Sequence, residues 1–192
     1  MLSVEGDDVT IAIVNPDGSQ AEMSGNGTRI AAAWLMSRTG STDARVHVGT
    51  RTVRVRRTEG GLYESELGTV EVGASELIDG IEVMPVSVGN PHAVVVGDPA
   101  SIGELGPRLE GHTRFPERTN VQVVRVERSG EVTARVWERG VGETAASGTG
   151  AVAVAAATHD DGEVVVHFPG GDLRVRLAEG RAWLTGPAEP LE

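Results

Sequence analysis

Two apolar segments that share an opening motif constrain the fold of this chain more than any other feature of its sequence. Residues 26–38 and 149–158 lack a polar face when drawn as helices, and they begin at Ser24-Gly25-Asn26-Gly27 and Ser147-Gly148-Thr149-Gly150. A helix that is apolar all round is buried, and neither segment is long enough to span a membrane. We therefore expect two helices inside the protein, with a strand as the alternative for residues 149–158.

A repeated unit surrounds each of these segments. Asn15 stands as far before Ser24 as Glu138 stands before Ser147, and each follows an expected strand. The unit is a strand, a polar residue, an acidic loop with glycine, the Ser-Gly-x-Gly motif and an apolar helix. Two copies of one unit predict two lobes related by an approximate twofold axis, with a site between them that faces both helix starts.

Alternating apolar and polar residues dominate the rest of the chain, and this pattern predicts strands. Clusters of Gly and Asp between the strands predict turns, and no third helix is expected. The sequence therefore predicts two helices among many strands. The expected strands cover residues 9–14, 46–56, 62–72, 121–126, 132–137, 164–168 and 173–177.

The charged residues exclude several classes of protein. A net charge of −11 would repel a phosphate backbone, so no nucleic-acid partner is expected. All 17 basic residues are Arg. The lack of lysine excludes a Schiff base, and with it a pyridoxal phosphate enzyme, and it also excludes a P-loop.

The remaining composition indicates a cytoplasmic protein and shows no pattern of zinc ligands. The chain has no cysteine, so thiolate metal ligands and disulfides are excluded, and the five histidines show no zinc-ligand spacing. No apolar run reaches the roughly 18 residues that cross a bilayer. Acidic residues near Met1 argue against a signal peptide, and no contact with a membrane is expected.

The helix starts after Ser24 and Ser147 are the candidates for a binding site. The first N–H groups of a helix lack internal partners and carry partial positive charge, and neighbouring glycines let an anion approach the backbone. Two facing helix starts would hold one small anion with a serine on each side. The alternative is that each serine is an ordinary N-cap. The duplication of the motif and of its upstream polar residue favours the site.

Short polar motifs lie where other strands should end. Asn and Arg suit the recognition of carboxylate or ammonium groups, and Glu and His can titrate or form ion pairs. Each motif taken alone is more typical of a turn. The motifs are Gly89-Asn90-Pro91-His92, Pro116-Glu117-Arg118-Thr119-Asn120 and Trp137-Glu138-Arg139-Gly140.

Together these motifs resemble those of the diaminopimelate epimerases, in the right order and along essentially the whole chain. The resemblance rests on residues 15–29, 89–92, 115–120, 138–150, 168–171 and 185–188. It implies an α/β (α+β) fold of two pseudo-symmetric lobes, each a curved mixed sheet wrapped around a central buried helix. It also implies an isomerase of lysine and peptidoglycan precursor biosynthesis, which interconverts LL- and meso-diaminopimelate without metal or cofactor.

The resemblance also implies roles for individual residues. In that family one cysteine removes the α-proton while a second protonates the opposite face, and these cysteines correspond to Ser24 and Ser147. Glu138 and His92 are expected beside this catalytic pair. Contacts with the amino-acid substrate carry over to the side chains of Asn15, Asn90, Asn120, Glu138 and Arg139, and to the backbone at Gly25, Asn26, Gly148 and Thr149.

The chain departs from the family pattern in two ways. A thiol has a pKa of about 8.5, whereas the hydroxyls of Ser24 and Ser147 do not titrate at physiological pH, so we expect impaired catalysis. The family also has earlier strands before the first motif. We therefore expect an incomplete first lobe over residues 1–70, a second lobe over 71–180 and a tail over 181–192 that returns toward the first lobe.

Two other functions stay open on the sequence alone. The paired serines also suit a non-catalytic protein that binds amino acids or has a structural role on the same fold. An isomerase or dehydratase of the proline racemase type is the other alternative. A homodimer, or another chain that supplies the first strands, also stays open.

Overall fold

The computed structural model describes residues 2–14 and 23–188 of the chain. In this part the α-helices are α1 (Gly25–Thr39), α2 (Ile102–Glu110) and α3 (Gly148–Thr158), and a 3-10 turn, η1 (Pro99–Ser101), precedes α2. The strands are β1 (Leu2–Glu5), β2 (Asp8–Ile11), β3 (Asp43–Val48), β4 (Arg51–Arg57), β5 (Tyr63–Thr69), β6 (Glu71–Val72), β7 (Glu76–Ile78), β8 (Ile81–Ser87), β9 (Pro91–Val96), β10 (Asn120–Arg128), β11 (Glu131–Glu138), β12 (Gly142–Thr144), β13 (Gly162–Phe168), β14 (Gly171–Ala178) and β15 (Arg181–Gly186).

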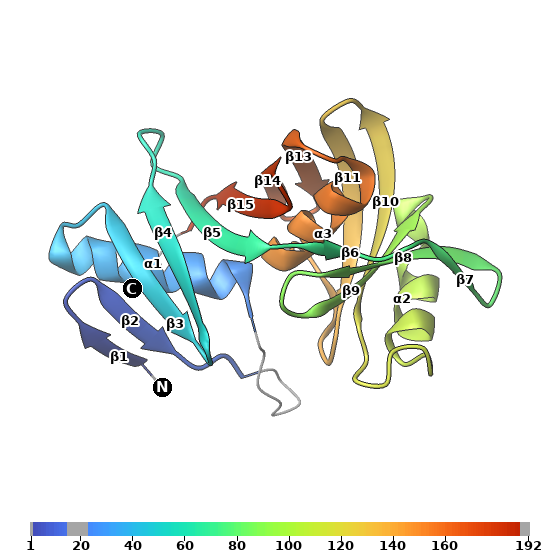
Figure 1. Ribbon diagram of the computed structural model, residues 1–192, viewed down its shortest axis with the longest axis horizontal. Helices are drawn as coiled ribbons and strands as arrows, with labels where there is room; N and C mark the ends of the chain where they lie inside the picture. The colour runs from blue at the N-terminus through green and yellow to red at the C-terminus, as the bar shows by residue number, and fades with distance from the viewer. Residues whose placement is uncertain (1, 15–22, 189–192) are drawn as a thin grey trace.

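These strands form one continuous sheet that curls around two helices. Its order is β1-β2-β3-β4-β5-β15-β14-β13-β11-β10-β9-β8-β6, while β12 pairs with β11 and β7 with β8. Figure 1 shows α1 against the strands at one end and α3 against those at the other. Strand β15 is antiparallel to both β5 and β14 and therefore joins the two ends.

The predicted repeat is present as a repeated topology. In the first copy, β2 and β3 are parallel, α1 connects them, and β3 and β4 form an antiparallel hairpin. In the second copy, β11 and β13 are parallel, α3 lies between them in the chain, and β13 and β14 form the hairpin. A crossover helix is the usual connection between parallel neighbours, so each apolar helix belongs to one such unit.

Both predicted helices are confirmed, and each begins one residue before its predicted start. Ser24 and Ser147 are the N-caps, and Gly40 ends α1 with a φ of 74°, a left-handed conformation that glycine adopts readily. Helix α3 is buried from Gly148 to Ala155, as an apolar helix requires. The strand alternative for residues 149–158 is wrong.

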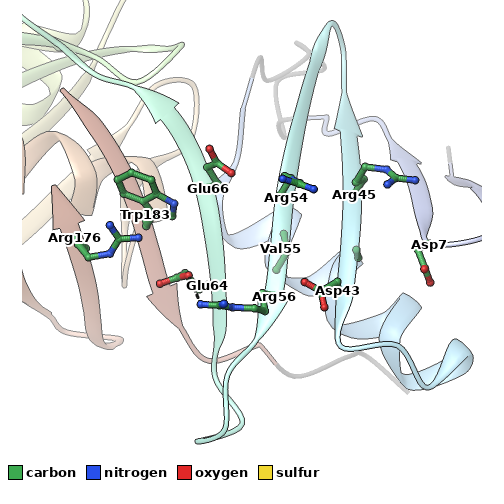
Figure 2. A pocket seen from close by; sticks show the side chains of 11 residues that line it. Asp7, Asp43, Arg45, Arg54, Val55, Arg56, Glu64, Glu66, Arg176 and Trp183 are labelled. Atoms are coloured by element: carbon green, nitrogen blue, oxygen red, sulfur yellow. Dashed lines mark hydrogen bonds and ion pairs between the residues drawn. The ribbon is translucent and has the colours of Figure 1, made fainter. Parts of the chain in front are cut away.

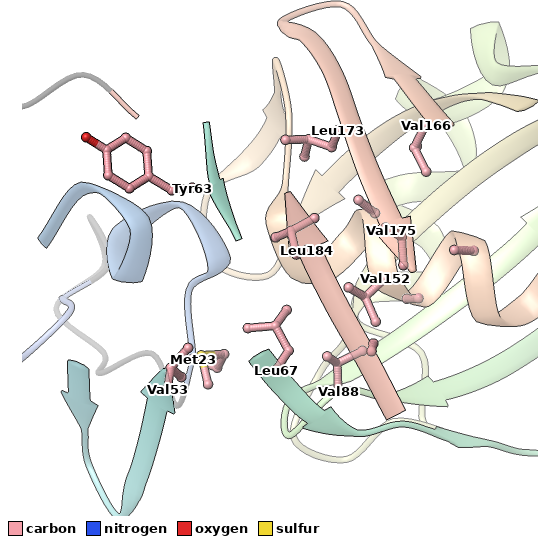
Figure 3. Packing of buried hydrophobic residues seen from close by; sticks show 14 of the residues in the cluster. Met23, Val53, Tyr63, Leu67, Val88, Val152, Val166, Leu173, Val175 and Leu184 are labelled. Atoms are coloured by element: carbon pink, nitrogen blue, oxygen red, sulfur yellow. The ribbon is translucent and has the colours of Figure 1, made fainter. Parts of the chain in front are cut away.

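One apolar core extends through both lobes. It contains Val53 from the first lobe, Val152 and Val175 from the second, and Leu184 from β15. Figure 3 shows Leu184 between the groups from the two lobes. A separate cluster lies between α2 and the sheet, where α2 buries Ile102 and Leu109 against β10.

Several strand predictions need correction. Residues 46–56 are not one strand but the hairpin β3–β4, because Gly49 turns the chain with a φ of 57°. Residues 62–72 are divided at Val70 into β5 and β6, and β5 pairs with β15 whereas β6 pairs with β8. The expectation that no third helix would occur is also wrong, since α2 forms over a segment that contains Gly103, Gly106 and Pro107.

The predicted lobe boundaries at residues 70 and 180 stay a prediction. Strand β15 lies within the predicted tail and is part of the sheet on both sides. In the part of the chain that the structure describes, no helix is long and apolar enough to cross a membrane.

Candidate functional site

The N-termini of α1 and α3 touch each other at two glycines. A Cβ atom added to Gly25 would lie 2.9 Å from the Cα of Gly148, and one added to Gly148 would lie 2.8 Å from the Cα of Gly25. Real side chains do not come so close to backbone, so any other residue would push the helices apart. The two Ser-Gly-x-Gly motifs therefore meet, which is the arrangement that their duplication predicts.

Both serines are N-caps of their helices. The Oγ of Ser24 accepts a hydrogen bond from the N–H of Gly27 at 3.0 Å, and the Oγ of Ser147 accepts one from the N–H of Gly150 at 3.3 Å. The N-cap alternative is thus correct for each serine, and it does not exclude a site. The two amides that follow each cap, at Gly25 and Asn26 and at Gly148 and Thr149, belong to the first turn and have no partner within their helix.

Glu138 links the end of β11 to the second serine. Its Oε1 accepts a hydrogen bond from the hydroxyl of Thr144 at 2.6 Å, and its Oε2 accepts one from the hydroxyl of Ser147 at 3.3 Å. The strand ends at Glu138, as the repeat predicts. A carboxylate therefore faces the hydroxyl at the N-terminus of α3.

His92 is the centre of a buried chain of hydrogen bonds that ends at α3. The amide Nδ2 of Asn90 donates to the Oγ1 of Thr149 at 3.3 Å, and the Oδ1 of Asn90 lies 3.0 Å from the Nε2 of His92. The Nε2 of Gln122 lies 2.9 Å from the Nδ1 of His92. With Gln122 as donor, the ring is the tautomer protonated on Nε2, which donates to Asn90.

Burial keeps this histidine neutral. The side chain is 1% exposed, and desolvation lowers the pKa of His92 to about 4, with the charge of Arg139 lowering it further and the hydrogen bond to Gln122 opposing the shift. The ring nitrogens bond to Asn90 and Gln122 rather than to either serine. His92 is thus placed to orient Asn90, and its predicted position beside the acid–base pair stays a prediction.

Asn120 and Arg139 join two loops at the end of the sheet. Asn120 donates from Nδ2 to the carbonyl of Pro91 at 2.9 Å and accepts at Oδ1 from the N–H of Arg139 at 3.0 Å. The Nη1 of Arg139 donates to the carbonyl of Glu117 at 3.2 Å. These bonds hold the loop of Asn90 and the loop of Glu138 next to each other.

Glu110 of α2 is a residue of the site region that the sequence motifs did not indicate. Its carboxylate accepts hydrogen bonds from the indole of Trp137 at 2.7 Å and from the N–H of Gly140 at 2.8 Å, and it pairs with Arg118. Burial would raise the pKa of Glu110, but these donors and the Arg118 charge hold it below its ordinary value. Glu110 therefore fixes both sides of the turn that carries Glu138.

The side chain of Asn26 binds the loop that precedes Ser147. Its Nδ2 donates to the carbonyl of Ala146 at 3.4 Å, while its Oδ1 accepts from the Nη2 of Arg29 at 2.7 Å. Arg29 is 3% exposed, and burial lowers its pKa to about 10. Arg29 and Asn26 thus join the first turn of α1 to the residue before Ser147.

The structure brings most of the predicted site residues into one region. Contacts connect Gly25 with Gly148, Asn26 with Ala146, Glu138 with Ser147, and Asn90 with Thr149. Asn15 lies outside the described residues. Gln122 was missed, although a polar residue within the buried run 120–124 of β10 was a signal for it.

A hollow on the outer face of the first lobe is a different kind of surface. Figure 2 shows its charged side chains on neighbouring strands, among them Arg45, Arg56, Glu64 and Glu66. Its volume is about 460 Å³, and its lining includes none of the predicted site residues. These charges form surface ion pairs such as Arg56 with Glu64. In contrast, a groove of about 780 Å³ includes Asn90 and His92 in its wall.

Metal ligands are not grouped in the described residues. No cluster of three or more His, Asp or Glu side chains in that part of the chain is arranged to hold a metal ion. The arrangement described above offers backbone amides, amide side chains, carboxylates, hydroxyls and a guanidinium group. These groups suit the binding of a small zwitterion by hydrogen bonds.

The sequence is similar to curated enzymes of one family. A family model described as diaminopimelate epimerase matches residues 84–190. The diaminopimelate epimerase of Desulforudis audaxviator is 39% identical over 213 residues, which cover 95% of this chain and 77% of the relative. The chloroplastic diaminopimelate epimerase of Oryza sativa subsp. japonica is 34% identical, and the match covers 98% of this chain and 64% of that protein.

Solved structures of related folds agree with the architecture. A structure described as a predicted epimerase from Pseudomonas aeruginosa superposes with a TM-score of 0.72 at 19% identity, covering 100% of this chain and 80% of that one. A hydroxyproline epimerase from Agrobacterium vitis with bound trans-4-hydroxy-L-proline gives a TM-score of 0.73 at 16% identity, covering 99% and 71%. Because these sequence identities are low, the similarity to the two structures shows a shared fold and nothing further.

Proposed function

Because this chain belongs to the diaminopimelate epimerase family, we propose that it binds diaminopimelate between the N-termini of α1 and α3. The observation that carries the proposal is the contact of Gly25 with Gly148, which brings two helix N-termini together. Four first-turn amides then face one small region, and a carboxylate is the anion that such amides bind. The amides are those of Gly25, Asn26, Gly148 and Thr149.

The reaction that this geometry suits is inversion at the α-carbon. A base on one face removes the α-proton, and the negative charge spreads onto the carboxylate that the amides hold. An acid on the other face returns a proton to the same carbon, so the configuration inverts and no proton is gained or lost overall. The positions for the two groups are 24 and 147, one at the head of each helix.

Glu138 would exchange a proton with the acid–base group at position 147. Its Oε2 accepts from the Ser147 hydroxyl, and Thr144 fixes its other oxygen. The second amino-acid end of the substrate would meet the amide and guanidinium groups of Asn15, Asn90, Asn120 and Arg139. Of these, Asn90 and Asn120 are held in place by bonds to Thr149 and Pro91.

Serine at both acid–base positions weakens catalysis more than binding. The first-turn amides do not depend on the side chain at positions 24 and 147, so carboxylate recognition is retained. A serine hydroxyl, in contrast, is too weak an acid to supply the base at neutral pH. We therefore expect a protein that binds diaminopimelate and turns it over slowly or not at all.

Calorimetry with LL- and meso-diaminopimelate tests this proposal. We expect one binding site per chain, and we expect Asn90→Ala to weaken binding while Asp172→Asn, an exposed change outside these contacts, leaves it unchanged. Trans-4-hydroxy-L-proline is the comparison ligand for the proline racemase-type alternative. A folded sample that binds this imino acid and neither diaminopimelate isomer would overturn the proposal.

A non-catalytic amino-acid-binding protein is the second candidate. The observation that favours it is that both serines complete ordinary N-caps, which need no reactive group. Exchange of the α-proton in deuterated water separates the candidates. Exchange well above that of a heat-inactivated sample would exclude this candidate, whereas binding without exchange would support it.

The proposal also covers where and in what form the protein acts. We place it in the cytoplasm, as a homodimer that acts on a free amino acid. Cell fractionation tests the location, and sedimentation of the purified chain tests the oligomeric state. A membrane-bound fraction or a strictly monomeric species would require these parts of the proposal to be withdrawn.

A further inference from the structure

Arg51 of β4 reaches from the first lobe to the loop that carries Asn90. Its Nη1 donates to the carbonyl of Val88 at 2.9 Å, and its Nη2 donates to the carbonyl of Leu67 in β5 at 2.8 Å. One planar guanidinium therefore bridges a first-lobe strand and the turn between β8 and β9. Arginine can make both bonds at once because its donors form a rigid fork.

Gly89 leaves the space that this guanidinium occupies. A Cβ atom added to Gly89 would fall 1.3 Å from the Nη1 of Arg51, so any side chain at position 89 would displace Arg51. Gly89 also has a φ of 87°, a conformation that other residues rarely adopt. The turn is thus built around the guanidinium as well as around its own backbone.

The same turn places Asn90 in the site. The N–H of Val88 donates to the carbonyl of Asn90 at 3.2 Å, which closes the turn. Asn90 is 9% exposed, and its amide lies between Thr149 of α3 and the ring of His92. Arg51 binds the carbonyl of Val88 in the same turn, so a shift of the guanidinium moves the backbone close to Asn90.

We infer that Arg51 is a positioning residue that sets Asn90 from the other lobe. The inference rests on the proposed function, in which Asn90 contacts the substrate. It assigns the first lobe a part in recognition beyond its own helix terminus. It also predicts that a change in the relative placement of the two lobes moves Asn90, since the side chain of Arg51 binds the carbonyls of both Leu67 and Val88.

A double-mutant cycle with Asn90 tests this inference. The variants are Arg51→Met, Arg51→Lys and the control Arg54→Met, which removes an exposed arginine of the same strand. Each is made in the parent chain and in the Asn90→Ala chain, and the Kd for meso-diaminopimelate is measured by calorimetry. Loss of charged hydrogen bonds predicts a Kd about tenfold higher for Arg51→Met in the parent chain.

The cycle separates positioning from general stability. If Arg51 acts through Asn90, Arg51→Met adds less than about a twofold change in the Asn90→Ala chain, and Arg51→Lys, which keeps one donor group, lies between Arg51→Met and the parent. Arg54→Met leaves the Kd unchanged in both chains. An equal effect of Arg51→Met in both chains, or an effect no larger than that of Arg54→Met, would overturn the inference.

A measurement without ligand keeps the inference separate from the proposed function. Exchange of the Asn90 side-chain amide protons with water, followed by NMR, reports how firmly that amide is held. We expect faster exchange in Arg51→Met and unchanged exchange in Arg54→Met, and equal rates in all three chains would contradict the inference. A parent chain that shows this difference but binds no diaminopimelate would overturn the proposed function alone.

Discussion

At the scale of single residues, the chemistry depends on the atom at positions 24 and 147. Each serine Oγ already accepts a hydrogen bond from a helix N–H, and a helix N-terminus also stabilises a thiolate at such a position. Positions 24 and 147 therefore have surroundings that would lower the pKa of a thiol, although the serine hydroxyls there do not ionise at physiological pH.

Exchanging both serines for cysteine should restore inversion. We expect Ser24→Cys with Ser147→Cys to raise the epimerisation rate by about a hundredfold or more, the usual gain from a matched acid and base. Each single change should leave inversion near the parent rate, because one face then lacks its proton donor or acceptor. Epimerisation of LL-diaminopimelate by the four chains at one pH is the measurement. A double variant that binds substrate but stays inactive would show that the serines are not the principal defect.

His92 should make the stability of the protein depend on pH. Its folded pKa of about 4 lies below the ordinary value of 6.5, so between these values the unfolded chain binds a proton that the folded chain does not. The free energy of unfolding should therefore rise with pH in this window, by about 2 kcal/mol between pH 5 and 6.5, and fall as the pH drops toward 4. Urea unfolding of the parent and of His92→Gln measures it, and equal slopes in both chains would contradict the assignment.

At the scale of secondary-structure elements, the close approach of α1 and α3 positions the site. The helices meet where Gly25 and Gly148 have no side chains, so the first turns of the two helices lie next to each other. The order of loop, cap and glycine in each motif is therefore a requirement of packing as well as of binding.

Alanine at either of these glycines should destabilise the protein and weaken binding together. The added Cβ would contact backbone at 2.9 Å for Gly25 and 2.8 Å for Gly148, and such overpacking costs about 1 to 3 kcal/mol. Gly103→Ala in α2 is the matched control, because a Cβ there meets nothing within 4 Å and should stabilise the helix by up to about 1 kcal/mol. The measurement is the thermal unfolding midpoint of the three variants. Equal changes of this midpoint at all three positions would contradict a contact between the two helices.

The sequence predicted those parts of the elements that depend on local pattern. Helices α1 and α3 could be predicted because each contains an apolar run that follows a Ser-Gly-x-Gly motif, and the strand end at Glu138 could be predicted from the repeat. Helix α2 was not predicted, since it is short and contains residues that disfavour a helix, although Ile102 and Leu109 bury one side of it. The insertion of β15 between β5 and β14, and the reach of Arg51 to Val88, join residues far apart in the chain and leave no local pattern.

At the scale of the whole molecule, the lobes share one sheet and one core. Strand β15 pairs on both sides, and the core cluster contains residues from both lobes. The stability of each lobe therefore depends on the other lobe. The shared sheet and core also hold the two facing helix starts in a fixed position relative to each other.

The lobes should consequently unfold in one transition. Trp34 lies in α1, Trp137 in β11 and Trp183 in β15, so variants that lack Trp183 and keep only one of the other two report on one lobe each. We expect the same urea midpoint from both fluorescence signals and from circular dichroism, as two-state unfolding requires. Separate midpoints for Trp34 and Trp137 would show that the lobes are independent domains.

The position of bound ligand can be located directly by NMR. In a titration of the uniformly ¹⁵N-labelled chain with meso-diaminopimelate, we predict that the largest shifts occur at the backbone amides of Gly25, Asn26, Gly148 and Thr149, since these amides would bind the carboxylate. The amides of β3 and β4, beneath the charged outer hollow of Figure 2, should stay unchanged. Shifts confined to that outer face, or no shifts at either helix start at saturating ligand, would contradict a site between the two helix termini.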